Sequence, residues 1–535
     1  MVKYIIMNFL TKVFSSTRAA WIFAACASLL LTFAAVWFGS LNQDEGWYLY
    51  AAQMVGEGKS PYRDFFFTQG PIMPIVYSVF APLWQSLSSP LHGLLGGRII
   101  TAIFGLAMVF SAVILVRKLV YKEHRAIASI SVFSIFACNL YHLYFTSIPK
   151  TYALGSFFLV SAFLLLYSAL QKENYMRGVF LFVSGLAFAF SSGTRISLIL
   201  VPLVVGISLI CAYKRYGFSF LPFGIGTLLG LFVTYGVFAL NDMAREGLFA
   251  AQWYHASRGG FDLFFALGSV LRLLRGYAAL AIVALCVLVA RFTKSLIADL
   301  NEDFLPKFVV RVMLVSFACV FFLQLSAPFP YDDYQVPIMA LVAIPIVVAF
   351  SRYFPEKQYA WFVVAVSLFM SGTSSMLQDW TTYTPDRFWS SKMECSELAK
   401  LRKTAREINN LDPDGKTILT QDIYLAVETS RKVPEGFEMG PFSLFPSISI
   451  DRAVKIHVHN LQTAKAVIEK APCSVAAMSG YGFAISAPKC DKVSEKDRSL
   501  LFSELEKKYD IALKVEHFGQ NDTMLNVYKR RESSK

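Results

Sequence analysis

The sequence predicts an all-α polytopic membrane protein that ends in a small α/β region. Of its 535 residues, 55% are hydrophobic, and the mean hydropathy is +0.49. Apolar windows of about 20 residues, the length that crosses a bilayer, recur up to residue 373. Residues 374–535 are more polar and carry many charges of both signs. This composition excludes an ordinary soluble globular protein.

The apolar windows predict about eleven transmembrane helices. They start near Ala20, Arg98, Ala126, Tyr152, Gly178, Ile196, Ser219, Gly276, Val309, Gln335 and Tyr359. Lys and Arg gather in alternate connections, such as Arg117–Lys118 and Lys214–Arg215, which the positive-inside rule places in the cytoplasm with the N-terminus. We therefore expect a multi-pass protein of the cell (inner) membrane whose C-terminal region is extracytoplasmic. These loops also account for the net charge of +13, so no nucleic-acid partner is implied.

Residues 40–97 form a large first outer loop between the first two predicted spans. Its first half mixes tyrosines and phenylalanines with Arg63 and Asp64, which suits a folded cap on the surface. Its second half, residues 72–87, is apolar but is interrupted by Pro74 and Pro82. That stretch is too short for a span, so we expect a helix lying in the membrane interface.

Residues 374–535 have the pattern of a soluble α/β domain, whereas residues 1–373 form the predicted transmembrane domain. The expected elements are a charged helix over 393–410, buried strands over 416–420 and 474–478, a helix from Ser494 to Tyr509, and a strand over 523–528. Ser494 and Asp497 have the spacing of a capping box. In an oxidising extracytoplasmic space, Cys473 and Cys490 are candidates for a disulfide.

An adjacent acidic pair, Asp44-Glu45, directly follows the first predicted span. A carboxylate at membrane depth costs roughly 2 to 4 kcal/mol, so a chain that keeps two of them there generally uses them. Asp44 is suited to take a proton from a hydroxyl or to hold a nucleophile in line. The structural alternative is a solvated pair, or one that is salt-bridged to Arg63 or Arg98.

Several motifs resemble those of the GT-C glycosyltransferases. Asp44-Glu45-Gly46-x-Tyr48, Pro61-Tyr62-x-Asp64-Phe65 and Gly70-Pro71 are similar to the first external loop of the protein O-mannosyltransferase and aminoarabinose-transferase-like group. Gly185-Leu186-Ala187-Phe188, Thr194-Arg195, Asp333-Tyr334-Gln335-x-Pro337 and Asp414–Leu419 are similar to later segments of that group. The resemblance covers most of the chain, and the first loop is its most specific part.

The resemblance implies a hexosyl- or pentosyltransferase that takes its sugar from a polyprenyl-phosphate donor in the bilayer. The acceptor would be a glycolipid, a glycan or a protein on the extracytoplasmic face. Asp44 matches the catalytic acidic residue, and Glu45 matches its neighbour, which is structural or positions the acceptor. Tyr48, Tyr62 and Asp64 belong to the same loop motif. The sequence identifies neither the sugar nor the acceptor.

A leaving phosphate develops negative charge, which fixed cations must stabilise. Arg195 is the first candidate, because it follows a span directly, and Lys150 and Arg258 are further ones. Each also fits an ordinary cationic side chain at the membrane boundary. The late loop departs from the family, which places a basic residue where this chain has Asp332-Asp333 before Tyr334. These aspartates would face an acceptor or a divalent ion, or form a solvated pair; metal dependence stays open, and no other cofactor is implied.

The rival interpretation is a transporter or flippase of lipid-linked sugars that performs no covalent chemistry. Many transporters contain two related halves with broken spans. We find no clear internal repeat in this sequence, and a large polar loop after the first span is unusual for that class. The sequence therefore favours the transferase.

Overall fold

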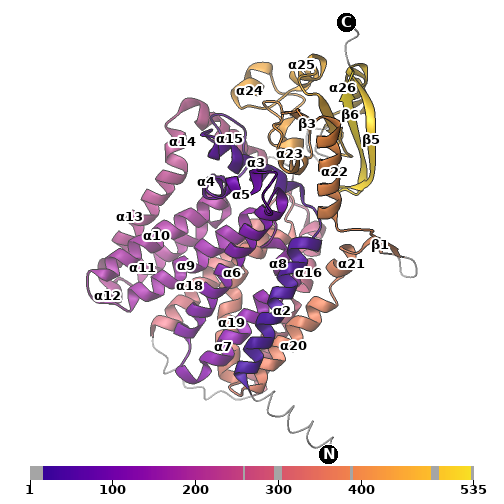
Figure 1. Cartoon of the computed structure of the whole chain (residues 1–535). Helices are drawn as coiled ribbons and strands as arrows, with labels where there is room; N and C mark the ends of the chain where they lie inside the picture. The colour runs from indigo at the N-terminus through magenta and orange to yellow at the C-terminus, as the bar shows by residue number, and fades with distance from the viewer. Residues whose placement is uncertain (1–15, 257–259, 294–303, 386–389, 484–492, 532–535) are drawn as a thin grey trace, which may run out of the picture.

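The computed structural model describes residues 16–256, 260–293, 304–385, 390–483 and 493–531. Among the described residues, those up to 373 form a bundle of helices, and the later ones form an α/β region at one end of that bundle (Figure 1). In Figure 1, helix α2 (Thr17–Phe38) runs from this junction toward the N-terminus at the opposite end. The C-terminal region therefore sits on the same side as the start of the first outer loop.

Eight helices in the described part of the chain are long and apolar enough to cross a membrane. They are α2, α6 (Leu94–Leu119), α9 (Thr151–Leu170), α10 (Met176–Thr194), the run α12 to α14 (Tyr213–Ala239), α18 (Phe304–Leu325), η5 with α19 (Asp332–Tyr353), and α20 with α21 (Gln358–Asp379). A bent pair, α16 (Leu263–Gly276) with α17 (Ala278–Thr293), would make a ninth. The chain is a multi-pass membrane protein.

All eleven predicted apolar segments are helical, but three of them are shorter than a full crossing. Helix α7 (Arg125–Ala137) has 13 residues, and the apolar helix Ile196–Cys211 also falls below the length of a straight span. Helix α17 has 16 residues and reaches that length only together with α16. At 1.5 Å per residue, 13 residues cover roughly 20 Å of a hydrocarbon core about 30 Å thick. The number of spans by length is thus lower than the sequence predicts, although the positions agree.

Helix α16 lies across the spans, because it meets α17 at an angle of 85°. Its exposed large side chains are Leu263, Phe264, Leu267, Leu271 and Leu274. An exposed apolar face on a helix that turns away from the spans is typical of a helix in the membrane interface.

The first outer loop is more buried than the sequence suggests. It contains α3 (Gln43–Gly56), α4 (Ile72–Ser78) and α5 (Ala81–Gln85), so two short helices replace the single interfacial helix that we expected. The expected surface cap is wrong, because Tyr62 and Phe65–Phe67 are all at most 2% exposed. Their cover comes from distant segments, including Phe238 and Phe445, which the local sequence does not reveal.

The C-terminal region is a four-stranded sheet with helices packed around it. Its main elements are α22 (Glu397–Leu411), β3 (Ile418–Thr420), α23 (Ile423–Thr429), α24 (Ile450–Lys455), α25 (Leu461–Lys470), β4 (Val475–Met478), α26 (Glu495–Lys508), β5 (Tyr509–Phe518) and β6 (Thr523–Arg530). The strand order is β3-β4-β6-β5, with β3 and β4 parallel and the other pairs antiparallel. A separate short hairpin joins β1 (Thr382–Pro385) and β2 (Ser390–Lys392).

The predicted strands and helices of this region are confirmed near their expected positions. Ser494 caps α26 and accepts a hydrogen bond from the amide of Asp497, as its spacing predicts. The sequence did not suggest the short helices α23, α24 and α25, the hairpin strands β1 and β2, or strand β5. Most side chains of β5 are half-buried or exposed. Cys473 is a buried free thiol, whereas Cys490 lies outside the described residues, so the disulfide stays a prediction.

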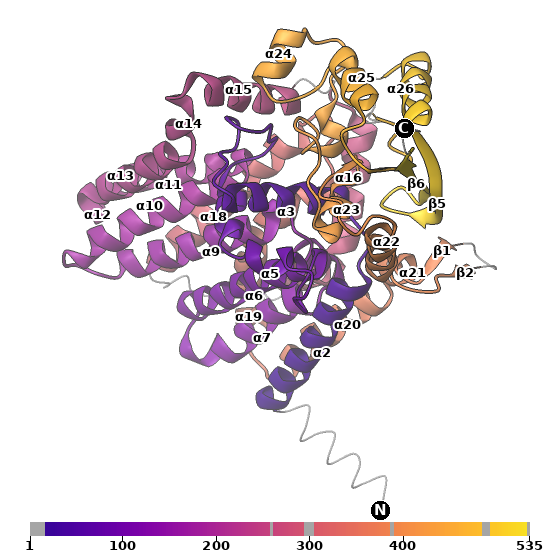
Figure 2. The ribbon, with the colours of Figure 1, turned by 45° about the horizontal axis from the view of Figure 1, so that its top comes forward.

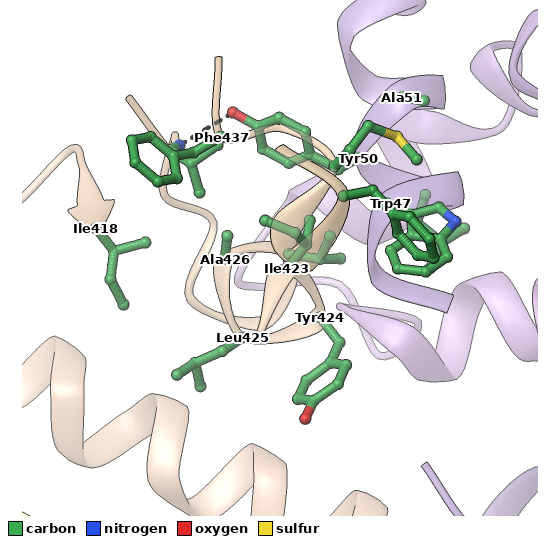
Figure 3. Packing of buried hydrophobic residues seen from close by; sticks show 14 of the residues in the cluster. Trp47, Tyr50, Ala51, Ile418, Ile423, Tyr424, Leu425, Ala426 and Phe437 are labelled. Carbon is green, nitrogen blue, oxygen red and sulfur yellow. Dashed lines mark hydrogen bonds between the residues drawn. The ribbon is translucent and has the colours of Figure 1, made fainter. Parts of the chain in front are cut away.

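One hydrophobic core runs from the first outer loop into the C-terminal region (Figures 2 and 3). Helices α3 and α23 lie side by side at this junction. Trp47 of α3 packs edge-on against Phe442 with 4.7 Å between ring centroids, and the Tyr50 hydroxyl accepts a 3.1 Å hydrogen bond from the Val433 amide. Burial of these large rings stabilises the helical part and the C-terminal region together. The expected boundary between two domains after residue 373 therefore stays a prediction.

Candidate active site

The acidic pair lies in the first turn of α3. Asn42 caps this helix, because its side chain accepts a 3.1 Å hydrogen bond from the Asp44 amide, while the Glu45 carboxylate accepts one of 2.9 Å from the Asn42 amide. The partial positive charge at a helix N-terminus favours both carboxylates. The local sequence thus fixes where each acidic side chain starts, and tertiary contacts then separate them.

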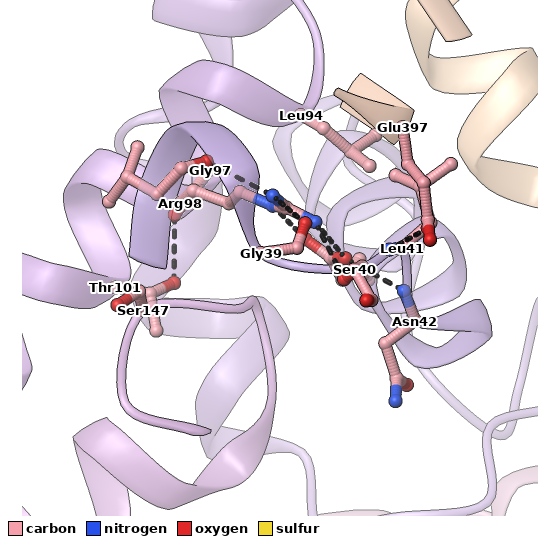
Figure 4. Close-up of polar contacts among 12 residues, drawn as sticks. Gly39, Ser40, Leu41, Asn42, Leu94, Gly97, Arg98, Thr101, Ser147 and Glu397 are labelled. Atoms are coloured by element: carbon pink, nitrogen blue, oxygen red, sulfur yellow. Dashed lines mark hydrogen bonds and ion pairs between the residues drawn. The ribbon is translucent and has the colours of Figure 1, made fainter. Parts of the chain in front are cut away.

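Glu45 is buried in the protein interior and is held by Arg98. Figure 4 shows Arg98 beside Gly39 and Ser40 at the end of α2. The guanidinium makes two 2.7 Å bonds to the two carboxylate oxygens, and both side chains are 0% exposed. Arg98 also donates to the carbonyls of Val36, Gly39 and Ser40, at 3.0, 2.9 and 3.1 Å. The Glu45–Arg98 pair therefore ties the end of α2 to the start of α3. For Glu45, this is the salt bridge to Arg98 that the sequence offered as the alternative to a catalytic role.

The C-terminal region fixes the start of α3 from the other side. Glu397 accepts a 2.6 Å hydrogen bond from the Leu41 amide, and Gln520 accepts one of 2.7 Å from the Gln43 amide. Gly46 allows α23 to approach closely, because a Cβ atom there would lie 2.1 Å from the backbone nitrogen of Tyr424. Any larger residue at position 46 would push the two helices apart.

Asp44 faces a second cluster that three separate segments build. The Lys150 ammonium lies 2.9 Å from Asp44 Oδ2 and 2.9 Å from Asp333 Oδ2. The Tyr152 hydroxyl also donates to Asp333 Oδ2, at 2.8 Å. The side chains of Asp44, Lys150 and Asp333 are 21%, 8% and 13% exposed, so solvent or a substrate reaches this cluster.

One cation bridges two carboxylates here. Desolvation of the Lys150 ammonium opposes its charge, but the carboxylates of Asp333 and Asp44 outweigh this effect and raise the pKa of Lys150 well above its usual range. Lys150 therefore stays charged across the physiological pH range. Its Nζ atom also lies 5.1 Å from the centroid of the Tyr152 ring, which adds a cation–π contact.

Arg195 stands beside this cluster, directly after α10. Its guanidinium carbon lies 4.3 Å from the ring centroid of Tyr334 and 5.3 Å from that of Tyr152. Within the described residues, the buried Nε atom of Arg195 has no hydrogen-bond partner. Two aromatic rings thus orient a guanidinium that keeps an unused N–H group, which suits the binding of an anion.

Of the three motif residues in the first outer loop, Tyr48 lies beside Asp44, whereas Tyr62 and Asp64 bond to other parts of the loop. Burial and the charge of Asp44 raise the pKa of Tyr48 well above its usual range, so this buried tyrosine stays protonated beside Asp44. Tyr62 instead donates its hydroxyl to the carbonyl of Gln69. Asp64 binds the guanidinium of Arg63, at 2.7 Å, and the amide of Ser60. Tyr62 and Asp64 therefore shape the loop, whereas Tyr48 lies at the cluster.

Comparison with known proteins supports this arrangement through its fold. No family model and no curated protein matches the sequence. The structure is similar to ArnT from Cupriavidus metallidurans in its apo state, with a TM-score of 0.62 and 12% identity over 96% of this chain and 98% of that chain. It is also similar to the same protein bound to undecaprenyl phosphate, with a TM-score of 0.59 and 11% identity over 95% and 97%. The Archaeoglobus fulgidus oligosaccharyltransferase in its apo form matches with a TM-score of 0.52 and 10% identity, over 97% of this chain and 75% of that chain.

The chain shares the fold of these solved structures. The ArnT matches span nearly all of both chains, so they include the C-terminal α/β region as well as the helices. The predicted fold class, an all-α polytopic protein with a small α/β region, is confirmed. At 10–12% identity the likeness concerns the fold, and the roles of individual residues must come from this chain's own geometry.

The sequence did not predict the partners of the late acidic pair, Asp332 and Asp333. Asp333 turns to Lys150, whereas Asp332 accepts from the Tyr141 hydroxyl at 2.7 Å and from Arg272 Nε at 2.9 Å. Asp332 thereby ties the interfacial helix α16 to η5 (Asp332–Ile338), which carries Asp333. Tyr152 was also missed, although its position two residues after Lys150 on the same helix end was a usable signal.

Two expectations about ligands, a phosphate contact from Arg258 and a divalent ion, stay predictions. Arg258 lies outside the described residues, so its predicted phosphate contact stays a prediction. No group of three or more His, Cys, Asp or Glu side chains that could hold a metal occurs in the described ranges. Between Asp44 and Asp333, the Lys150 ammonium takes the position that a bridging divalent ion would need.

Proposed function

We propose that this protein is a membrane glycosyltransferase that moves a sugar from a polyprenyl-phosphate donor to a hydroxyl or amine of an acceptor. The observation that carries the proposal is the Asp44–Lys150–Asp333 cluster with Arg195 beside it, on the GT-C fold. One similar structure is of ArnT bound to undecaprenyl phosphate, which supports the donor class. Glu45, which the sequence pairs with Asp44 as catalytic, is assigned a positioning role because both of its oxygens bind Arg98.

The chemistry is a single in-line displacement, which inverts the sugar carbon. Asp44 takes the proton of the acceptor as its oxygen or nitrogen bonds to that carbon, and the bond from the carbon to the phosphate oxygen breaks. The electron pair leaves with the phosphate, whose growing charge is met by the free N–H of Arg195 and by Lys150. Asp333 holds Lys150 in place by accepting a hydrogen bond from its ammonium, and Tyr152 in turn donates to Asp333.

An apolar groove near Arg195 suits the lipid tail of the donor. It runs between α11 (Leu200–Cys211) and α13 (Phe220–Leu231), has a volume of about 640 Å³, and is lined almost wholly by apolar side chains. Its lining begins at Ile199, close to Arg195 along the chain. A polyprenyl chain in this groove would bring its phosphate to the guanidinium without crossing an aqueous path.

A transfer assay tests the proposal against the transporter alternative. Membranes that contain the protein receive a polyprenyl-phosphate sugar labelled in the sugar, with envelope lipids and glycans as acceptors. We expect label on an acceptor for the wild type and for the loop control Asp64→Asn, and none for Asp44→Asn. Label that crosses the bilayer unchanged, with no product, would overturn the transferase and support a flippase.

We also propose that the cluster and the C-terminal region lie on the extracytoplasmic face of the inner membrane. The supporting observation is the basic connections at the opposite ends of the spans. Cys395 is an exposed native thiol in the C-terminal region and serves as a probe. A membrane-impermeant maleimide should label it in spheroplasts, whereas Cys395→Ser should lose that label. Labelling that requires lysis would contradict this orientation.

A further inference from the structure

Two parallel strands of the C-terminal region end beside each other near the cluster. Strands β3 and β4 pair in parallel, with Thr420 opposite Ala477. The chain continues from β3 into Gln421-Asp422 and from β4 into the turn that holds Tyr481. Ligands of parallel sheets generally bind outside the carboxyl ends of the strands. The two segments meet at this edge, since Gln421 Oε1 accepts a 2.6 Å hydrogen bond from the Phe483 amide.

This edge holds two buried polar atoms that lack partners among the described residues. They are Gln421 Nε2 and the Tyr481 hydroxyl. Between them lies the buried carboxylate of Asp422, which accepts hydrogen bonds from Tyr424 and from Ser479. Gln421 and Asp422 are 4% and 1% exposed. Buried polar groups are nearly always paired, so two such atoms beside a buried carboxylate indicate a position that a polar ligand completes.

The edge faces the first turn of α3. Asp422 Oδ1 accepts a 2.6 Å hydrogen bond from the hydroxyl of Tyr424, whose backbone packs on Gly46. Burial, and then the charges of Asp422 and Asp44, raise the pKa of Tyr481 well above its usual range. Tyr481 is therefore close enough to both Asp422 and Asp44 to be affected by their charges.

We propose that Gln421, Asp422 and Tyr481 form a sugar-binding subsite, which holds the hydroxyl-bearing part of the acceptor against Asp44. This inference rests on the proposed transferase function and deepens it, because it assigns the acceptor to glycolipids or glycans. A carboxylate that accepts, an amide that donates and a phenol that does both match the hydroxyls of a sugar, each of which donates and accepts. An acceptor that presents one hydroxyl on a peptide would leave most of these atoms unpaired.

With this subsite, the donor and the acceptor would be bound by different parts of the protein. The helical part would hold the donor phosphate through Arg195 and Lys150, and the C-terminal region would hold the acceptor. Loss of a subsite contact should then weaken acceptor binding alone. The Michaelis constant for the donor and the rate at saturating acceptor should stay near their wild-type values.

Steady-state kinetics of sugar transfer from a labelled polyprenyl-phosphate sugar test whether the subsite binds the acceptor. The acceptor probe is a glycolipid fraction of the envelope from which protein has been removed. Tyr481→Phe and Asp422→Asn should each raise the acceptor KM about 5- to 20-fold, the effect of one lost hydrogen bond in a built site. The donor KM should change less than about 2-fold. Tyr383→Phe, a tyrosine that contacts Lys400, and the exposed Asp414→Asn are matched controls in the same region.

Thermal unfolding of the purified full-length variants separates binding from structure. Tyr481→Phe removes an unpaired hydroxyl, so we expect its stability to equal or exceed that of the wild type. An unchanged acceptor KM, or an increase that comes with a matching loss of stability, would overturn the subsite. Wild-type protein that transfers no label would instead overturn the underlying function, so the two failures are distinct.

Discussion

Two ion-pair clusters meet at the first turn of α3, and they differ in almost every physical respect. The Glu45–Arg98 pair is 0% exposed, and its guanidinium is shared with three backbone carbonyls. The Asp44–Lys150–Asp333 cluster is 8–21% exposed and places one ammonium between two carboxylates. Adjacent acidic residues therefore serve different purposes, because one side of the helix faces the core and the other faces a partly open site. Every N–H group of Arg98 has an acceptor in the buried cluster, whereas one ammonium serves two carboxylates in the cluster that we propose to be catalytic.

The largest expected difference between the two clusters is the loss of turnover on substitution of Asp44. Asp44→Asn keeps the size of the side chain but removes its charge and basicity. We expect turnover to fall about 10²- to 10⁴-fold, the usual contribution of general acid–base catalysis, while the unfolding free energy changes by less than about 1 kcal/mol. Initial rates and denaturant unfolding in detergent measure the two effects. Turnover near the wild-type value would remove Asp44 from the mechanism.

Glu45→Gln should show the reverse pattern. It leaves the buried Arg98 guanidinium without its counter-charge, and breaking a buried pair in this way costs about 3 to 5 kcal/mol. The measurement is the unfolding midpoint, with Glu57→Gln as the control, because Glu57 pairs with Lys432 at the surface. A Glu45→Gln protein that is fully stable but inactive would show that the two clusters are not as different as their geometry indicates.

Lys150→Met removes the cation that Asp44 and Asp333 share. We expect a smaller loss of turnover than for Asp44→Asn and a smaller loss of stability than for Glu45→Gln. It leaves Asp44 and Asp333 facing each other, so one of the pair should take up a proton and turnover should fall about 10-fold or more. Lys150→Arg keeps the charge and should recover part of the rate.

The pH dependence follows from the raised pKa of Lys150. Its stabilising contribution is fully present below the ordinary lysine pKa and is lost only as pH rises through the higher folded value. Wild-type stability should therefore show no Lys150 transition between about pH 6 and 9. A transition there that disappears in Lys150→Met would contradict the assigned ion pairs.

The smallest effect is expected at Asp64, the exposed member of the same loop motif. Arg63 holds the pKa of Asp64 below its usual range, so its contribution is present above the ordinary pKa and is lost as pH falls through the lowered one. Asp64→Asn should cost at most about 1 kcal/mol at neutral pH and leave turnover within about 2-fold. A large loss of activity without a loss of stability would move Asp64 into the site.

The sequence named Asp44, Lys150, Arg195 and Asp333 as candidates, from charge beside apolar segments and from the family resemblance, and the structure brings these four residues together. It could not show that Lys150 joins Asp44 to Asp333, because that contact bridges segments 183 residues apart along the chain. The buried aromatic residues of the first loop were misjudged for the same reason, since their cover comes from remote segments.

The subsite residues lay beyond sequence reasoning altogether. Gln421 and Asp422 read as an ordinary polar turn, and only the parallel register of β3 with β4 brings Tyr481 to them. Strand β5 was missed because its exposed faces weaken the alternating pattern that marks a strand. Long apolar helices, by contrast, follow from composition alone, and only their exact lengths required the structure.

The hydrogen bond from Gln43 to Gln520 links residues 477 positions apart. During synthesis the ribosome delivers the start of α3 long before the hairpin that fastens it. A chain truncated before residue 520 would lack this bond, so the amide of Gln43 would lose its partner while the Glu45–Arg98 pair remained in place.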